Sequence, residues 1–490
     1  MKNGKIMKNA RRRNVKRIVF AVIFLTVLIM LTSCTNRDDF DYGWDLTETT
    51  YRPEFTFPRN VYYKGYTVNV LVSGNFDRND FHASYTSAEV LDEAVSIRNG
   101  ALEIELGVKV KTENIYGTNF STGAALDKLR KDYNSNSQIY DLAHIDGREA
   151  VKCAVGGYLA DINTYDHIDT STPWWDHNAN KELSVNGKLF FTTGDISVCD
   201  DMATSCVLFN KNVLAENSEL TSPYVLLDEN KWTVDALIEQ SRIADHESTN
   251  GIIIWNGAAN SLFSSGGNKI CETDSNGLRL TLNDPDLTSL LEKYVQLFRS
   301  SSCYNYQKNT TPDKYEITRA TLFGEGNAYF CVSTLQTAAE FAERGMNFGV
   351  LPMPKASSDQ DRYYNNLNTM YSQFLCIPAK QEHRERTGAV AEMMAYMARD
   401  LLTPAYRRLI IGSEPSARDS NAFDMVINNK SFDIGALFVI GDAEYLIADA
   451  MNYDGDVQSV INDIEIAAKD EIVRINEDLF KQIYSPRSKN

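Results

Sequence analysis

The sequence lacks the short motifs that identify many enzyme classes. No Gly-x-Ser-x-Gly nucleophile elbow occurs. His246-Glu247 is not followed by the second histidine of a zinc protease, and Gly187-Lys188 lacks the upstream glycine and the following Ser or Thr of a phosphate-binding loop. Around Gly455, a calcium loop would place Ala450 and Ile461 at its first and last ligand positions, where they cannot bind the ion. Nothing in the sequence therefore demands catalysis.

Cysteine is scarce and scattered. Eight cysteines occur, and after Cys34 an odd number remains, with no Cys-x-x-Cys pair: Cys153, Cys199, Cys206, Cys271, Cys303, Cys331 and Cys376. This arrangement indicates neither a disulfide framework nor a zinc site. Most have apolar neighbours, so we expect small buried hydrophobes. One or two disulfides stay open as an alternative, because spacing does not place the sulfur atoms.

The chain has too few basic residues to favour binding to nucleic acid or to anionic lipid headgroups. Eight of the 49 Lys and Arg residues precede Cys34, whereas none of the 66 acidic residues does. From Cys34 onward, 41 basic residues face 66 acidic ones, a formal charge of −25. Both of those partners require basic patches, so this composition disfavours them.

The N-terminal segment carries the features of a secretory signal. Its first 17 residues include eight basic residues and no acid, Ile18–Leu31 is apolar, and Leu31-Thr32-Ser33-Cys34 closes the run with small residues and a thiol. The run falls short of the roughly 20 apolar residues of a membrane span. It resembles a bacterial lipobox, which implies a diacylglycerol on the Cys34 sulfur and cleavage before Cys34. An uncleaved single-pass anchor is the alternative.

About 455 residues follow Cys34, enough for two or more lobes, and neither Pro nor Gly is enriched. Residues 35–60 are polar, acidic and interrupted by Pro53 and Pro58, which favours a tether. A first strand on the domain surface is the alternative for the aromatic end at Phe55 and Phe57.

Strand and helix patterns alternate along the rest of the chain. We expect strands at 67–72, 108–110, 139–145, 205–209, 251–255 and 348–351, and helices at 90–101, 124–133, 234–244, 284–300, 389–402 and 461–484. Gly107 should end the helix predicted at 90–101. Such alternation predicts an α/β fold with two lobes, each a mostly parallel sheet flanked by helices, that share the chain discontinuously.

Aromatic and polar residues occur together just beyond several predicted strands. Trp255-Asn256, the stretch from Asn260 to Phe263, and Asp146-Gly147-Arg148 have this mixture. Aromatic planes stack on the apolar faces of sugar rings while polar groups bind the hydroxyls. Loops at the carboxyl ends of parallel strands are where α/β sheets bind ligands. Each aromatic has core packing as its alternative, and Trp174-Trp175 after Pro173 is the clearest case for simple packing.

An acidic pair offers a competing enzymatic interpretation. Asp200 and Asp201 would suit a glycoside hydrolase, which needs two carboxylates flanking the bond. Neighbouring residues of a strand point to opposite faces, so this pair would not converge on one bond by itself. Solvated or hinge-facing acids are the more frequent situation.

With these residues in place, the chain resembles the extracellular solute-binding lipoproteins of ABC importers, in the branch with maltose-binding protein. The resemblance rests on the lipobox and on the order of several segments: 140–148, 157–163, 173–176, 186–190, 209–211, 231–233, 323–326 and 348–355. It implies two α/β lobes joined by two or three hinge crossings that close over a ligand, the first near 197–203 and the next near 357–366. It also implies an ABC permease as partner, a monomer, and no cofactor, metal or catalytic residue.

The resemblance further implies a domain plan and a binding site. The plan is a signal peptide at 1–33, a tether at 34–60, an N-terminal lobe of 61–200 plus 365–410, and a C-terminal lobe of 201–364 plus 411–490. An Asp-Arg pair binds sugar hydroxyls in maltose-binding relatives, and here Gly147 separates Asp146 from Arg148. The predicted ligand-binding residues are Asn75, Asp146, Arg148, Asp200, Trp255, Asn256, Asn260, Phe263 and Tyr371. The predicted ligand is an oligosaccharide, and the predicted location is the outer face of the bacterial cell membrane. A surface glycan hydrolase and a sensor lipoprotein are the alternatives.

The predicted anchor can be tested separately from the predicted receptor. Cys34→Ala removes the thiol that would carry the lipid, so we expect the protein to be lost from the cell surface while ligand affinity is unchanged. Cell fractionation and calorimetry on the released protein measure the two properties. Loss of binding in the released variant would contradict the separation of tether and receptor.

Overall fold

The structure is a computed structural model that describes residues 61–76, 78–83, 89–116, 123–246, 249–282, 285–453 and 455–484. All of them belong to one compact unit, Arg59–Asn490. The predicted signal, the predicted lipid-attachment residue Cys34 and the predicted tether lie outside the described residues. None of the described helices combines the length and apolar character that a membrane crossing requires.

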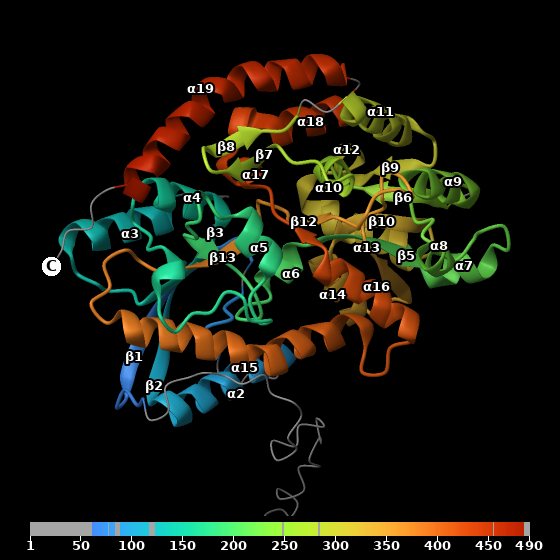
Figure 1. The fold of residues 1–490 in the computed structure, drawn as a ribbon. Helices are drawn as coiled ribbons and strands as arrows, with labels where there is room; N and C mark the ends of the chain where they lie inside the picture. Colours follow the sequence, from blue (N-terminus) through green and yellow to red (C-terminus); the bar gives the residue numbers. More distant parts are fainter. Residues whose placement is uncertain are drawn as a thin grey trace, which may run out of the picture. The chain divides into compact units, whose positions relative to one another are not determined.

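The first sheet has five strands in the order β2-β1-β3-β13-β4 (Figure 1). β1 pairs in parallel with β2 and β3, whereas β13 is antiparallel to both β3 and β4. The bounds are β1 (Tyr66–Gly74), β2 (Val108–Tyr116), β3 (Leu142–Asp146), β4 (Phe191–Thr192) and β13 (Gln373–Cys376). One strand, β13, thus runs against the other four.

The second sheet has the order β11-β5-β10-β6-β9. β6 is parallel to β9 and β10, and β5 is antiparallel to β10 and β11. The bounds are β5 (Ser205–Asn210), β6 (Asn250–Ile254), β9 (Cys303–Asn305), β10 (Ala328–Thr334) and β11 (Phe348–Leu351). The predicted α/β fold of two mostly parallel sheets flanked by helices is confirmed, and each sheet is mixed because one strand, β13 or β5, is reversed. In each sheet the reversed strand is the one by which the chain enters from the other sheet.

The chain passes between the sheets through short segments. It leaves β4 for β5 through α6 (Cys199–Ala203), and it returns from β11 to β13 through β12 (Asn365–Asn366). A long helix, α15 (Arg384–Ile411), then packs against both α2 (Val90–Leu106) and α14 (Leu335–Glu343). After α16 (Ala417–Asn428), β14 (Lys430–Ser431) pairs in parallel with β12. The predicted lobe boundaries and hinge positions stay a prediction.

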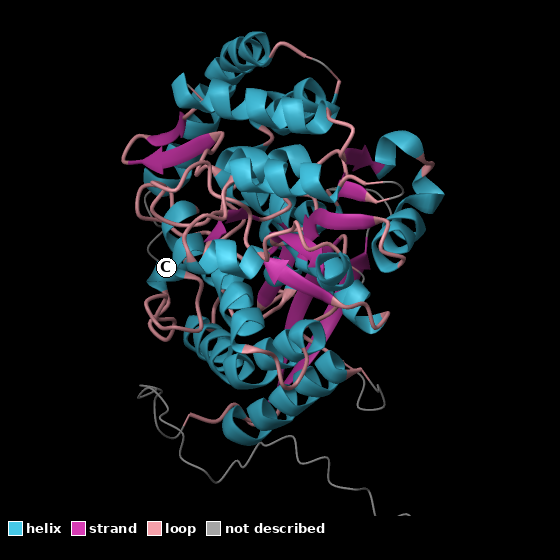
Figure 2. Cartoon of the chain, turned by 90° about the vertical axis from the view of Figure 1, so that its right-hand side faces the viewer, coloured by secondary structure: helices cyan, strands magenta, loops and turns pink. Residues whose placement is uncertain are grey.

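The remaining helices lie around the strands (Figure 2). With the first sheet come α3 (Ala124–Ser135), α4 (Gly147–Val155), η1 (Ile162–Thr164) and α5 (His177–Glu182). With the second come α7 (Lys211–Glu216), α8 (Pro223–Asp228), α9 (Val234–Ala244), α10 (Ala258–Ser265), α11 (Pro285–Arg299), α12 (Tyr306–Asn309), η2 (Pro312–Lys314) and α13 (Tyr315–Gly324). A hairpin adds two strands, β7 (Cys271–Asp274) and β8 (Gly277–Leu280). The unit ends with the C-terminal helices α17 (Ile434–Phe438), η3 (Ile440–Asp442), α18 (Ala443–Asn452) and α19 (Val457–Tyr484).

Local sequence explains several of these boundaries. Gly107 ends α2 in the left-handed conformation, with φ 65°, and its N–H bonds the carbonyl of Glu103, as predicted. Thr233 caps α9 by accepting the N–H of Ala236. The seven cysteines after Cys34 are all free, and all but the half-buried Cys303 are buried. Their predicted role as small hydrophobes is thus confirmed, and the structure shows no disulfide among the described residues.

A buried carboxylate holds the tandem tryptophans. Glu392 of α15 accepts the indole N–H of Trp174 at 2.9 Å and that of Trp175 at 2.8 Å. Both tryptophans are buried, so their bonds to Glu392 pack their loop onto α15. Burial raises the pKa of Glu392 to about 7, although the hydrogen bonds from the two indoles act in the opposite direction.

Glu392→Gln should change how stability depends on pH. A carboxyl whose pKa lies near 4.3 in the unfolded chain and higher in the folded protein keeps its proton longer when folded, so stability is lost as pH rises between these values. The variant lacks this loss and should gain about 1 to 3 kcal/mol relative to wild type between pH 5 and pH 8. Urea unfolding at both pH values measures the change, and parallel pH profiles would contradict the assignment.

Candidate functional site

Six of the predicted ligand-binding residues follow or precede strands at corresponding sheet edges. On the first sheet, Asn75 follows β1, Asp146 and Arg148 lie at the end of β3, and Tyr371 lies just before β13, whose Gln373 pairs with Asp146. On the second sheet, Trp255-Asn256 follows β6. Parallel strands end at one edge of their sheet, and loops there form ligand sites in α/β proteins.

Helix α18 connects these two edges. Its first turn provides Glu444 and Tyr445, which bind Arg148 at the end of β3. Its last residue, Asn452, donates to the backbone carbonyl of Asn256 at 3.0 Å and accepts from Asn305 at 2.9 Å. The surrounding helices follow the same arrangement, since α17 packs against α4 while α18 packs against α10 and α11 (Figure 1). One helix thus contacts the loops of both sheets that sequence reasoning selected.

Arg148 is the most heavily bonded of the predicted residues. Its Nη1 donates to the Tyr445 hydroxyl at 2.8 Å, and its Nη2 donates to Thr369 Oγ1 at 3.0 Å and to Glu444 Oε2 at 2.9 Å. The guanidinium carbon lies 5.7 Å from the centre of the Tyr445 ring. Burial lowers the pKa of Arg148, but the Glu444 carboxylate and the Tyr445 oxygen raise it more, so the group stays charged.

Two predicted residues at the first sheet edge serve the local backbone. Asp146 caps α4, because its Oδ1 accepts the N–H of Arg148 at 2.9 Å and that of Glu149 at 3.2 Å. Asn75 donates from Nδ2 to the carbonyl of Met370. This bond holds the loop that presents Tyr371. Both side chains therefore position neighbouring groups of the site.

Tyr371 brings an aromatic ring to the space between the sheets. It stacks on Phe76, with ring centres 5.2 Å apart and an angle of 33° between the planes. Burial raises the pKa of Tyr371, with further influence from the charges of Glu316, Arg319 and Glu340 on α13 and α14. A residue that precedes a strand of the first sheet thus lies close to helices of the second.

Asn260 and Phe263 line a small cavity beside the Arg148 cluster. Thr369 and Glu444, both partners of Arg148, line the same cavity, so these predicted residues lie close together. The cavity measures about 10 Å³. That volume is about the space that one water molecule requires. A sugar would need the walls to move apart.

Two buried donors at these edges have no acceptor. Arg148 Nε and the indole Nε1 of the half-buried Trp255 make no hydrogen bond with any described residue. Buried donors are normally paired, since an unpaired one costs about 1–3 kcal/mol. Hydroxyl or ring oxygens of a ligand are the kind of acceptor that would satisfy them.

Asp200 lies in a different buried cluster. Lys430 Nζ binds Asp200 Oδ2 at 2.5 Å, Asp201 Oδ1 at 2.8 Å and Asp176 Oδ2 at 3.1 Å. Burial lowers the pKa of Lys430, but the three carboxylates raise it more. Burial raises the pKa of Asp200 to about 7. The carboxylates surround an ammonium group, and no group of acids, His or Cys in the described ranges is arranged to hold a metal ion.

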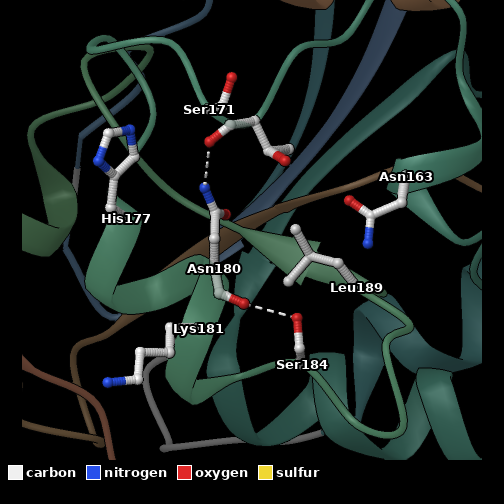
Figure 3. A pocket seen from close by; sticks show the side chains of 8 residues that line it. Asn163, Ser171, His177, Asn180, Lys181, Ser184 and Leu189 are labelled. Atoms are coloured by element: carbon white, nitrogen blue, oxygen red, sulfur yellow. Dashed lines mark hydrogen bonds between the residues drawn. The ribbon is translucent and has the colours of Figure 1, made fainter.

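Two of the larger cavities lie away from the predicted ligand-binding residues. One of about 620 Å³ borders the Lys430 cluster, with Trp174, Asp195 and Arg399 among its lining residues. Another of about 410 Å³ lies around α5 (Figure 3). Its Asn180 already donates to the carbonyl of Thr170 at 3.0 Å. Neither cavity is lined by a predicted ligand-binding residue.

Sequence reasoning missed the aromatics of α18 and of the residue that follows it. Tyr445 is 46% exposed and Tyr453 is 61% exposed, so both present much of their rings to solvent. Lys308 Nζ lies 4.5 Å from the centre of the Tyr453 ring. The predicted ligand-binding residues lie mainly beside strands. These tyrosines instead lie on or directly after a helix that begins almost 300 residues after Arg148. Their exposure is the signal that would have identified them.

The fold, but not the sequence, is similar to known proteins. No model of a protein family matches the sequence, and no curated protein is similar to it. The solved cyclic alpha-maltosyl-1,6-maltose binding protein of Arthrobacter globiformis matches with a TM-score of 0.58 and 15% identity, over 85% of this chain and 99% of that one. The galacto-N-biose-/lacto-N-biose I-binding protein of a Bifidobacterium longum ABC transporter, in complex with lacto-N-biose, gives 0.58 and 13% over 84% and 98%.

A third structure extends the match to the whole length of its relative. The sugar-binding protein MalE of Xanthomonas citri gives a TM-score of 0.56 and 13% identity, over 86% of this chain and 100% of that one. The unit therefore has the fold of the sugar-binding proteins of ABC transporters. The resemblance seen in the sequence is confirmed at the level of the fold.

Lys430→Met should destabilise the protein more at high pH. Removing the ammonium leaves three buried carboxylates without their partner, at a cost of about 3 to 5 kcal/mol. The cost should fall at pH 5.5, where carboxyls with raised pKa values take up protons. Urea unfolding at pH 5.5 and pH 8 measures this. Lys269→Met, which removes a buried lysine paired with Glu182, is the control and should show a smaller pH effect. An equal loss at both pH values in Lys430→Met would contradict the charge account.

Proposed function

We propose that this protein binds a carbohydrate, most simply an oligosaccharide, between its two sheets and delivers it to an ABC importer. The observation that carries the proposal is that Arg148, Trp255 and Tyr371 lie at strand ends of the two sheets that α18 connects, in a fold whose solved examples bind sugars. Those sugars are ligands of the solved proteins. The geometry of this chain supports the same class of ligand.

The chemistry of the edges suits a sugar. Tyr371 and Tyr445 offer aromatic faces for the apolar side of a ring. Arg148 Nε and Trp255 Nε1 offer buried donors that lack an acceptor among the described residues. An oxygen-rich, uncharged ligand with one apolar face would use both kinds of group.

Binding in this arrangement requires movement. The cavity beside Arg148 accommodates about one water molecule, and α18 holds both sheet edges through Arg148 and Asn452. A ligand therefore has to favour a state in which these contacts are rearranged. The ligand shifts the equilibrium between the described state and the rearranged state by the difference between its affinities for them.

We further propose that the protein acts as a monomer on the outer face of the bacterial membrane, held by lipid on Cys34. The basic and apolar N-terminal segment and the Leu-Thr-Ser-Cys sequence support this. An anchor keeps the receptor near its permease partner. A receptor that reports to a sensor would share the fold, and isolation of the membrane partner distinguishes the two.

The hydrolase alternative loses its candidate residues. Asp200 and Asp201 both bind Lys430, so the pair does not face a substrate across a cleft. A glycosidase needs two carboxylates on either side of one bond. We therefore propose binding without catalysis.

Calorimetry against neutral gluco- and galacto-oligosaccharides tests the proposal. At least one compound should bind, and Tyr445→Ala should weaken its binding about five- to ten-fold by removing a stacking surface. Tyr62→Ala is the control, because Tyr62 is 58% exposed but packs on Gly107, away from the strand edges. A panel without any binding, or equal effects of the two variants, would contradict the proposed site.

A further inference from the structure

The Arg148 cluster contains a carboxylate from within the chain. Glu444 Oε2 accepts from Arg148 Nη2 at 2.9 Å and from Thr369 Oγ1 at 2.7 Å. The side chains of Arg148 and Glu444 are only 7% and 11% exposed. Arg148 and Glu444 therefore form a nearly dry ion pair at the place where the proposed ligand meets the first sheet.

The ion pair with Glu444 limits the hydrogen-bond donors and the charge that Arg148 can present to a ligand. A guanidinium has five N–H donors and a positive charge. Glu444, Thr369 and Tyr445 already occupy donors on both terminal nitrogens, and the carboxylate of Glu444 balances the charge. The Nε–H remains without a partner among the described residues. Two of the five donors, the Nε–H and one Nη1–H, are left for a ligand in an electrically balanced site.

Other charged residues near Arg148 also disfavour an acidic ligand. Asp433 lines the same cavity as Glu444, and Asp449 is exposed on the same helix. Across the gap, Arg319 near Tyr371 is already paired with Glu340 at 2.5 Å. A carboxylate or phosphate on the ligand would approach Glu444 without a free cation in this cluster to compensate it. Like charges in a site shielded from water repel strongly.

We propose that Glu444 is a specificity residue that makes the site select neutral sugars and reject acidic ones. The inference rests on the proposed carbohydrate function and adds the charge of the ligand. The carboxylate of Glu444 occupies the position at Arg148 that the carboxylate of a uronate would take. Its negative charge serves as the counter-ion that an acidic ligand would otherwise supply.

The alternative is that the pair only ties α18 to α4. In that case Glu444 would influence stability and the affinity for all ligands alike. The specificity account differs, because it predicts an opposite change for neutral and acidic ligands. The ratio of the two affinities is therefore the deciding measurement.

Glu444→Gln provides the test, with matched pairs of probes. Neutral gluco- and galacto-oligosaccharides of two to four units are compared with the same compounds oxidised at C6 to uronates, by calorimetry and thermal shift. Wild type should bind a neutral compound at least about ten-fold more tightly than its uronate. The variant leaves Arg148 without its counter-ion, so the ratio should shift toward the uronate by about ten-fold or more.

Asp141→Asn is the matched control. Asp141 is also in a buried ion pair, with Arg386 at 3.4 Å and side chains 6% and 13% exposed, but it precedes β3, at the end of that strand opposite to Arg148. It should leave the ratio of neutral to acidic affinity unchanged. If Glu444→Gln does not fold, the preference of wild type for the neutral member of each pair still tests the inference.

The outcomes separate the two proposals. If neutral sugars bind but wild type prefers uronates, or if both variants change the ratio equally, the function stands and the role of Glu444 is wrong. If no compound binds to wild type or to either variant, the carbohydrate function fails and the inference fails with it.

Discussion

The contact between Arg148 and the first turn of α18 is the interaction on which the site depends. α4 begins at the end of β3, so the position of Arg148 is fixed by the first sheet. Asn452 at the other end of α18 binds the loops after β6 and β9 of the second sheet. A helix of ten residues therefore relates the two edges to one another. Any change in the distance between the sheets must alter one of its two ends.

A strained connector precedes this helix. Val439 and Asp442 both have positive φ, at 59° and 52°, and Gly441 between them has φ 56°. A β-branched residue rarely adopts this conformation, which costs of order 1–3 kcal/mol. The N–H of Gly441 bonds Glu471 of α19 at 3.0 Å. The entry to α18 is therefore held by tertiary contacts.

Local sequence patterns predicted the secondary structure well but not the final partners of the polar residues. Gly107 stops α2 and Thr233 caps α9 because these effects involve residues within one turn. Mostly parallel sheets were predicted correctly, but the identity of the reversed strands was not, because strand direction at β5 and β13 depends on how the chain returns from a distant sheet. The binding roles of the nine selected residues stay predictions.

The partners of Arg148 and Asp200 show why the site was only partly predictable. Glu444 lies 296 residues after Arg148, and Lys430 lies 230 residues after Asp200. No local pattern reports such pairs. Asp146 was selected as a ligand group, yet its carboxylate caps the helix that carries Arg148. Strand ends could be predicted from the sequence, whereas tertiary packing decides which polar atoms at those ends are already bonded.

The reversed strand of the first sheet has a consequence for the order of events in synthesis. Gln373 of β13 pairs with Asp146 of β3, so β3 has an unpaired edge until more than 220 further residues have been made. Long-range pairing of this kind is slow, and unpaired edges favour aggregation. β4 cannot join the sheet before β13 does, since β13 is its only neighbour in the described sheet. The first sheet is thus begun early in synthesis and completed late.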